Sequence, residues 1–252
     1  MSLSLVGSEM CIRDSHNGVQ NYRLLKYFTF ALLVISPLAG LSEPIAIPEP
    51  PNQGVKLEEK DIKAREQLAE MIDKIMGDPE ASERITQTGQ ERTIFCNVCH
   101  GKDGNSKRPG VPNLAAQNPV YLLDQIQRFA DGRRYDRSMS SLAESFTEEE
   151  KIMLAIYYSK MEAKPSGIGD PEQWARGKKI YDIGCAQCHG ENGRGEKGYA
   201  RLASQKPDYV VKMLKEFKSY TGRRANPWMT VVSASLSDEE MAAVAAYVST
   251  LQ

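Results

Sequence analysis

Two short stretches, CNVCH at Cys96–His100 and CAQCH at Cys185–His189, decide the fold of this chain. Each is a Cys-X-X-Cys-His signature, in which two thiols can add to the vinyl groups of one c-type haem and the adjacent histidine can bind the iron. A polar, glycine-containing loop follows each copy, at Gly101–Gly104 and Gly190–Gly193. The doubled signature predicts two covalently attached haem c groups. Their predicted binding residues are Cys96, Cys99 and His100 for one haem and Cys185, Cys188 and His189 for the other.

Two other uses of paired cysteines fit the sequence less well. Structural zinc sites usually place their two Cys-X-X-Cys pairs roughly 15–20 residues apart, whereas Cys96 and Cys185 are separated by a whole domain's length of chain. A thioredoxin-like redox pair needs a βαβ context, and the flanks here have helical patterns. Covalent haem remains the favoured interpretation.

The N-terminal region, residues 1–42, has the features of a secretory signal. Arg23 and Lys26 precede the apolar stretch Tyr27–Ile35, and small residues follow over Ser36–Ser42. A positive region, an apolar region and a cleavage zone of small residues make up a signal peptide. A retained membrane anchor is the alternative, but the apolar stretch is shorter than the roughly 20 residues that a spanning helix needs. We therefore expect export to the periplasm, with cleavage near Ala39 or after Ser42.

Residues 1–15 and the overall composition set further limits. The stretch MSLSLVGSEMCIRDS does not fit a signal and resembles a translated sequencing-adapter tail, so we exclude it from the fold. It contains Cys11, the one cysteine outside the two signatures. The formal net charge of the 252 residues is −1, and no basic, aromatic-rich stretch indicates nucleic acid as a partner.

The chain contains an internal repeat. With Cys96 aligned to Cys185, the equivalences continue to the C-terminus with two small gaps. Leu114–Gln117 matches Leu202–Gln205, and a Gly-Arg-Arg triplet recurs at Gly132–Arg134 and Gly222–Arg224. Further equivalent pairs are Tyr121 and Tyr209, Phe129 and Phe217, Met139 and Met229, and Phe146 and Leu236. We therefore predict two tandem domains, residues 83–164 and 165–252.

Each repeat has helical patterns. Capping boxes at Thr147–Glu150 and Ser237–Glu240 predict the start of a last helix, and apolar residues recur behind them at helical spacing. Middle helices are predicted over about 119–131 and 207–219, and Asp170 with Pro171 predicts the start of the helix before the second signature. The fold class is therefore all-α, each unit a small helical fold around one covalent haem.

Residues 43–82 differ from both repeats. Four prolines within residues 43–54 predict an extended linker, and Lys56–Met76 predicts an amphipathic helix. The segment has five basic and ten acidic side chains, a net charge of −5. The helix either docks a partner or packs on the first domain with its acidic face in solvent, and packing is the favoured alternative.

Composition limits the sixth iron ligands. Of the three histidines, His16 lies in the signal region and the other two are the expected proximal ligands, so two-histidine coordination is excluded in the mature chain. Methionine is the natural candidate and lysine a weaker one. Met139 and Met229 alone occupy equivalent places, 39 and 40 residues after their histidines, in polar loops. They are the predicted distal ligands.

The Gly-Arg-Arg triplets are the remaining site candidates. Arg134 and Arg224 are predicted either to contact a haem propionate, as guanidinium groups do with carboxylates, or to lie in a solvated turn. Tyr121 and Tyr209 are predicted to be packing residues.

These motifs resemble the di-haem class I cytochromes c of the c4 type over about Gln90–Leu251. The resemblance implies that each repeat folds around one haem, that the haems are close enough to exchange electrons, and that the protein transfers electrons in the periplasm, commonly towards terminal oxidases. Two departures stand out. The family tends to have a proline just before the Leu-Ala-Gly-Gln-like segment, and Pro112 fits this pattern in the first repeat. In the second repeat Ala200 stands at that position, where its backbone carbonyl can still orient His189. The second departure is the acidic segment 43–82, which typical members lack.

The expected function is therefore electron transfer rather than catalysis. Six-coordinate iron has no open position for substrate, so each haem would exchange one electron with a redox protein partner, a terminal oxidase or a dehydrogenase. One alternative is the haem c subunit of a dehydrogenase or flavocytochrome complex. A di-haem enzyme such as a peroxidase is a weaker one, because it needs a labile or absent sixth ligand. Peripheral membrane association is left open.

Overall fold

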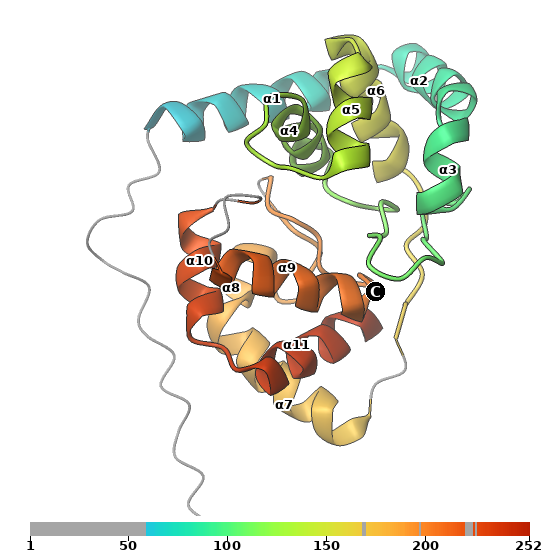
Figure 1. Cartoon of the computed structure of the whole chain (residues 1–252). Helices are drawn as coiled ribbons and strands as arrows, with labels where there is room; N and C mark the ends of the chain where they lie inside the picture. The colour runs from blue at the N-terminus through green and yellow to red at the C-terminus, as the bar shows by residue number, and fades with distance from the viewer. Residues whose placement is uncertain (1–58, 168–169, 197, 220–223, 225) are drawn as a thin grey trace, which may run out of the picture. The chain divides into compact units, whose positions relative to one another are not determined.

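A computed structural model describes residues 59–167, 170–196, 198–219, 224 and 226–252, with the side chains of 59–62 left out. The predicted signal region, the proline-rich linker, Gly222 and Arg223 lie outside the described residues. Within these ranges the regular secondary structure is helical, as predicted (Figure 1). No helix in the described part of the chain is long and apolar enough to span a membrane.

The predicted amphipathic helix is α1, Glu59–Gly77, and it packs on the first repeat. Ile72 is fully buried in the core of that repeat, and Leu68, Met71 and Ile75 pack against the same core half-buried. The acidic residues Glu66, Glu70 and Asp73 on α1 remain exposed. The alternative favoured from the sequence, a packed helix with a solvated acidic face, is therefore confirmed.

Five helices of the first repeat follow α1. A proline at the first helical position and the carboxylate of Asp78, which accepts from the backbone N–H groups of Glu80 and Ala81, start the helix that begins at Pro79. The predicted boundary between residues 82 and 83 lies inside this helix. The helices are α2 (Pro79–Arg92), α3 (Ile94–His100), α4 (Pro119–Ala130), α5 (Arg137–Ser145) and α6 (Glu148–Ser159).

The second repeat has the same order of helices. Asp170 and Pro171 begin the first of them, as predicted, although the Asp170 side chain makes no capping hydrogen bond. The helices are α7 (Pro171–Gly184), α8 (Ala186–His189), α9 (Pro207–Ser219), α10 (Pro227–Ala234) and α11 (Asp238–Thr250). The middle helices α4 and α9 match their predicted ranges to within one residue.

Both predicted capping boxes are present. The hydroxyl of Thr147 accepts from the Glu150 N–H at 3.2 Å, while the Glu150 carboxylate accepts from the Thr147 N–H at 3.0 Å. Ser237 and Glu240 make the same pair of bonds at 3.2 and 2.8 Å. Each box satisfies two N–H groups that a helix start otherwise leaves unpaired.

In each repeat a glycine allows the helix before the signature to cross the last helix closely. A Cβ at Gly177 of α7 would lie 2.0 Å from the Ala243 carbonyl oxygen of α11. A Cβ at Gly89 of α2 would lie 2.5 Å from the Tyr157 ring of α6. The crossings bury two separate cores, one around Leu123, Leu154 and Ile156 and the other around Ile180, Val244 and Val248, and these cores position the two signatures.

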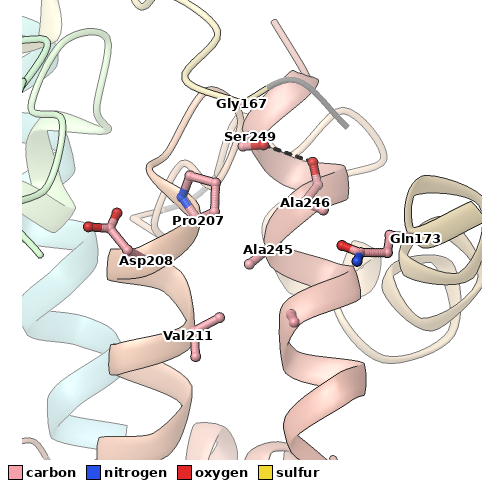
Figure 2. Close-up of a pocket in the computed structure, with 9 residues that line it drawn as sticks. Gly167, Gln173, Pro207, Asp208, Val211, Ala245, Ala246 and Ser249 are labelled. Carbon is pink, nitrogen blue, oxygen red and sulfur yellow. Dashed lines mark hydrogen bonds between the residues drawn. The ribbon is translucent and has the colours of Figure 1, made fainter. Parts of the chain in front are cut away.

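An open groove lies between α7, α9 and α11 of the second repeat (Figure 2). Pro207 and Val211 of α9 face Ala245 and Ser249 of α11 across it, whereas the Asp208 carboxylate points away from α11. Its lining contains none of the predicted haem residues, so the groove is separate from the candidate haem sites.

Candidate haem sites

Each Cys-X-X-Cys-His signature ends a short helix on its histidine. His100 is the last residue of α3 and His189 the last of α8, and their side chains are 6% and 8% exposed. The ring nitrogen Nδ1 lies 3.0 Å from the Pro112 carbonyl oxygen in His100 and 2.8 Å from the Ala200 carbonyl oxygen in His189. Because a carbonyl only accepts, Nδ1 carries the proton and the lone pair of Nε2 is left for a metal.

Burial also favours the neutral form of both rings. Desolvation lowers the pKa of His100 and of His189, and the hydrogen bond to the backbone carbonyl opposes this only in part. A neutral imidazole with a free Nε2 is the form that binds haem iron.

The carbonyls that orient the histidines are fixed by matching loops. In the first repeat the Gly104 carbonyl accepts from the N–H groups of Leu114 and Ala115, at 2.8 and 3.1 Å. In the second repeat the Gly193 carbonyl accepts in the same way from Leu202 and Ala203. These bonds fold the chain back over the signature. The position of Ala200 shows why proline is dispensable there, since the contact uses only a backbone carbonyl.

The four signature cysteines are free thiols. Cys96 and Cys185 pack against the cores of their own repeats, whereas Cys188 is exposed. Burial raises the pKa of the Cys96 thiol, and it raises the pKa of Cys185 to about 12. Each pair belongs to a different repeat with its own core, an arrangement that does not fit one shared zinc site.

The prediction that both methionines lie in loops is wrong. Met139 is the third residue of α5 and Met229 the third residue of α10. The Asp136 carboxylate accepts from the Met139 N–H at 3.1 Å, and the Asn226 side-chain oxygen accepts from the Met229 N–H at 3.0 Å. The two methionines are therefore equivalent in local structure as well as in sequence. Both are half-buried, and Met229 packs against the same core as Cys185.

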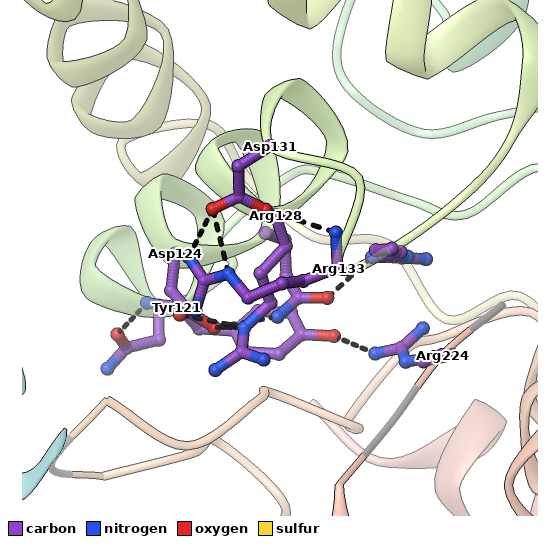
Figure 3. Close-up of polar contacts among 9 residues, drawn as sticks. Tyr121, Asp124, Arg128, Asp131, Arg133 and Arg224 are labelled. Carbon is purple, nitrogen blue, oxygen red and sulfur yellow. Dashed lines mark hydrogen bonds and ion pairs between the residues drawn. The ribbon is translucent and has the colours of Figure 1, made fainter. Parts of the chain in front are cut away.

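Arg134 and Arg224 meet each other across the two repeats. Their backbones form an antiparallel β-bridge. Both guanidinium groups donate to the Tyr209 hydroxyl, at 2.9 Å from Arg134 and 3.2 Å from Arg224. Arg224 also donates to the Tyr121 hydroxyl (Figure 3). The two tyrosines, predicted as packing residues, thus hold arginines as well, and Arg224 is buried rather than in a solvated turn.

This arginine pair is a concentration of positive charge at the junction of the repeats. The nearby acids are already paired, Asp124 of α4 with Arg128 and Asp131 at the end of α4 with Arg133 (Figure 3). Among the described residues, Arg134 and Arg224 have no acidic partner. Burial opposes ionisation of Tyr209, but the two guanidinium groups overcome it and lower the pKa to about 8. A carboxylate ligand would complement this charge.

A set of polar contacts between the repeats was missed from the sequence. The side chains of Gln117 and Gln205, each 5% exposed, bond to the backbone of the opposite repeat. The sequence did hold a signal for these contacts, because both glutamines occupy equivalent positions in an otherwise apolar segment. A polar side chain that recurs where burial is expected needs a hydrogen-bond partner.

The comparisons agree with the repeat and its signatures. A sequence model of the cytochrome c family matches residues 174–252. Cytochrome c4 of Thiocapsa roseopersicina is 34% identical over 184 residues, which cover 68% of this chain and 92% of that protein. The chain belongs to the cytochrome c4 family.

Two further similarities extend the cytochrome c4 relationship. The crystal structure of reduced recombinant cytochrome c4 from Pseudomonas stutzeri has a TM-score of 0.61 and 30% sequence identity, covering 66% of this chain and 98% of that chain. The thiosulfate dehydrogenase electron acceptor of Thiomonas intermedia is 32% identical over 166 residues, which cover 60% of this chain and 75% of that protein.

Membership of the cytochrome c4 family confirms the predicted fold class, two tandem class I cytochrome c domains, and the two covalent haem c groups. It also confirms that the chain is a di-haem electron-transfer protein with redox protein partners. The residues present fit the cofactor, because each repeat offers two free thiols beside a buried, neutral imidazole whose Nε2 is available.

Proposed function

We propose that the chain transfers one electron per haem through two iron sites, each held by one histidine and one methionine. The observation that supports this most strongly is the repeated geometry of His100 and His189. Each is buried directly after its cysteine pair and donates Nδ1–H to a backbone carbonyl, which leaves Nε2 for the iron. When bound, each haem supplies an iron that alternates between the ferrous and ferric states.

Met139 and Met229 are the proposed sixth ligands. A helix N-cap places each one in the first turn of a short helix, at equivalent positions of the repeat. With a histidine and a methionine both bound, the iron would have no position left for a substrate, and the haem would exchange electrons only. The thioether also raises the reduction potential relative to a second histidine.

Arg134 and Arg224 are proposed to bind haem propionates. Their guanidinium groups lie together, without acidic partners in the described part of the chain, and two tyrosine hydroxyls fix their orientation. Charge-assisted hydrogen bonds from arginine to a carboxylate are stronger than neutral ones. A propionate there would neutralise the buried charge and hold the two cofactors on either side of one junction.

We further propose that the protein works in the periplasm after removal of the signal region, residues 1–42, and that it is not an enzyme. Its specific partners would be a dehydrogenase as electron donor and a terminal oxidase as acceptor. A dehydrogenase as donor is supported by the similarity to a protein named as the electron acceptor of thiosulfate dehydrogenase.

Carbon monoxide binding tests the closed axial sites. Carbon monoxide binds ferrous iron only where an axial position is open or easily vacated, so the reduced, haem-loaded protein is expected to show no spectral change. Met139→Ala and Met229→Ala are each expected to bind carbon monoxide at one haem. Met76→Ala, which removes an exposed methionine of α1, is the matched control and should leave the spectrum unchanged.

Rapid binding of carbon monoxide by the unaltered protein would contradict the proposal and favour the di-haem enzyme.

The remaining alternative, a haem c subunit of a dehydrogenase or flavocytochrome complex, predicts a stable complex in size-exclusion chromatography of a gently lysed periplasmic fraction. Free migration of the protein at its own size would favour the diffusing carrier.

A further inference from the structure

Two buried glutamines link the repeats in a reciprocal arrangement. The Gln117 side-chain oxygen accepts from the Arg201 N–H at 2.6 Å, and its amide nitrogen donates to the Arg201 carbonyl at 2.8 Å. The Gln205 side chain makes the same two bonds to Asn113, at 2.8 and 3.0 Å. Because a backbone N–H only donates and a carbonyl only accepts, both amide orientations are determined.

The backbone holds both glutamines in place at the cost of strain. The residue before each one, Ala116 or Ser204, has a positive φ, of 52° and 63°, in the region that non-glycine residues rarely adopt. The Ala116 N–H donates to the Tyr158 carbonyl and the Ser204 N–H to the Val248 carbonyl, at 3.1 and 3.0 Å. In each repeat, therefore, a strained turn that bonds to the last helix, α6 or α11, directs the glutamine towards the opposite repeat.

Each glutamine bonds to the peptide group that orients the other repeat's histidine. The Arg201 N–H belongs to the same peptide unit as the Ala200 carbonyl, which accepts from His189 Nδ1. The Asn113 N–H belongs to the same unit as the Pro112 carbonyl, which accepts from His100 Nδ1. Two hydrogen-bonded chains thus run from a glutamine of one repeat, through one peptide group, to the histidine of the other.

We propose that Gln117 and Gln205 are positioning residues that act across the repeats, Gln117 on His189 and Gln205 on His100. An oxygen that accepts from a peptide N–H polarises the peptide and makes its carbonyl a stronger acceptor. A stronger acceptor at Nδ1 makes the imidazole a better electron donor to iron and fixes the ring plane. Since a better donor favours the ferric state, each glutamine lowers the reduction potential of the haem in the opposite repeat.

This inference rests on the proposed role of His100 and His189 as iron ligands. It adds that neither site is complete within its own repeat, because the peptide that orients each histidine is itself held from the other side of the junction. Loss of contact between the repeats would change both potentials without changing any ligand.

Nuclear magnetic resonance of the reduced, haem-loaded protein labelled with 15N-histidine tests the crossed effect. Low-spin ferrous haem is diamagnetic, so the Nδ1–H signals are observable, and the Tyr199 ring beside His189 assigns that residue. Gln117→Met is expected to move the His189 Nδ1–H signal upfield, speed its exchange with water and raise the potential of the second haem. Gln205→Met is expected to do the same to His100 and the first haem.

Lys206→Met is the matched control, because the Lys206 ammonium also bonds across the repeats, to the Arg108 carbonyl. The Lys206 backbone N–H, which donates to the Gln205 side-chain oxygen at 3.0 Å, is kept in this variant. Lys206→Met should move neither signal. Gln117→Glu and Gln205→Glu, as buried protonated carboxyl groups, keep an oxygen on the same N–H and an O–H donor on the same carbonyl, and they cover the case in which a methionine variant fails to fold. They should leave the opposite histidine's signal in place or move it downfield.

Movement of the histidine in the variant's own repeat, equal movement of both signals, or no movement of either would overturn the inference. The result is separable from failure of the proposed function, because the Nδ1–H signal reports the hydrogen bond itself while carbon monoxide binding reports the axial ligands. If the Nδ1–H signal of the opposite histidine moves while both reduction potentials stay unchanged, the hydrogen-bonded connection is supported and its effect on the reduction potential is rejected.

Discussion

The first repeat fills part of its core with a helix from outside the repeat, whereas the second fills its core from its own helices. In the first, Ile72 of α1 is fully buried among residues of α4 and α6. In the second, the Tyr181 ring packs on Tyr247 at 5.3 Å between centroids, and Trp174 covers Tyr247 from outside. The same order of helices around a haem signature thus tolerates two ways of completing a core.

The difference lies in the crossing of the first and last helices of each repeat. In the second repeat Gly177 contacts the backbone of α11 directly, so the helices need no further cover. In the first repeat Gly89 contacts a tyrosine side chain, and α1 packs against the two crossing helices and α4. The added helix therefore fills the core of the first repeat, and its contact with the second repeat is limited to the surface around Tyr199.

Gly177→Ala is expected to have the largest effect. The new methyl group would lie 2.0 Å from the Ala243 carbonyl oxygen, a backbone atom that cannot rotate away. Overpacking of this kind costs about 3 kcal/mol, and the helix propensity of alanine recovers only about 1 kcal/mol. Gly89→Ala is the matched variant, in which the new methyl group meets the Tyr157 side chain at 2.5–2.9 Å and no backbone atom, so its loss should be smaller. Urea unfolding of the haem-loaded protein measures both, and an equal or larger loss for Gly89→Ala would contradict the comparison.

Ile72→Ala is expected to destabilise the first repeat next most strongly. A buried isoleucine truncated to alanine costs about 2–5 kcal/mol, the lower end where the core can collapse. The loss should appear as earlier unfolding of the first repeat, followed by the absorption of the haem bound at Cys96. Glu70→Ala, on the exposed face of the same helix, is the control. Unchanged unfolding of Ile72→Ala would mean that α1 does not contribute to this core.

Arg65→Ala is expected to have the smallest effect, and in the second repeat rather than the first. Arg65 of α1 lies over the Tyr199 ring at 5.6 Å, and Tyr199 is edge-on to His189. A cation–π contact of this kind contributes about 0.5–1 kcal/mol. Thermal unfolding followed at the second haem should detect the loss, and Arg65→Lys should recover part of it. A loss confined to the first repeat would show that α1 supports only that repeat.

The sequence was sufficient for features that depend on local patterns. The signatures, the capping boxes and the middle helices follow from residues close together in the chain, and the structure has them where predicted. The helices that contain Met139 and Met229 were missed because, at nine and eight residues, they are too short for apolar periodicity to show. Their N-caps, Asp136 and Asn226, were the available signal.

Contacts between the repeats could not be predicted in the same way. Tyr121, Tyr209, Gln117 and Gln205 each bond to groups far away in the sequence, and a repeat alignment shows only that they are equivalent. It cannot show that equivalent residues serve the opposite unit. For the same reason, the sequence could not decide whether Arg134 and Arg224 contact a haem propionate or lie in a solvated turn. That choice depends on where the second repeat lies relative to the first.

Controlled-potential coulometry of the haem-loaded protein, with absorption followed throughout, tests most directly that each repeat carries one haem that exchanges one electron and has no open position on its iron. The account predicts uptake of two electrons per chain in reversible steps, one per haem, with both haems low-spin in both oxidation states. Uptake of a single electron, or a high-spin signal at either haem, would contradict it.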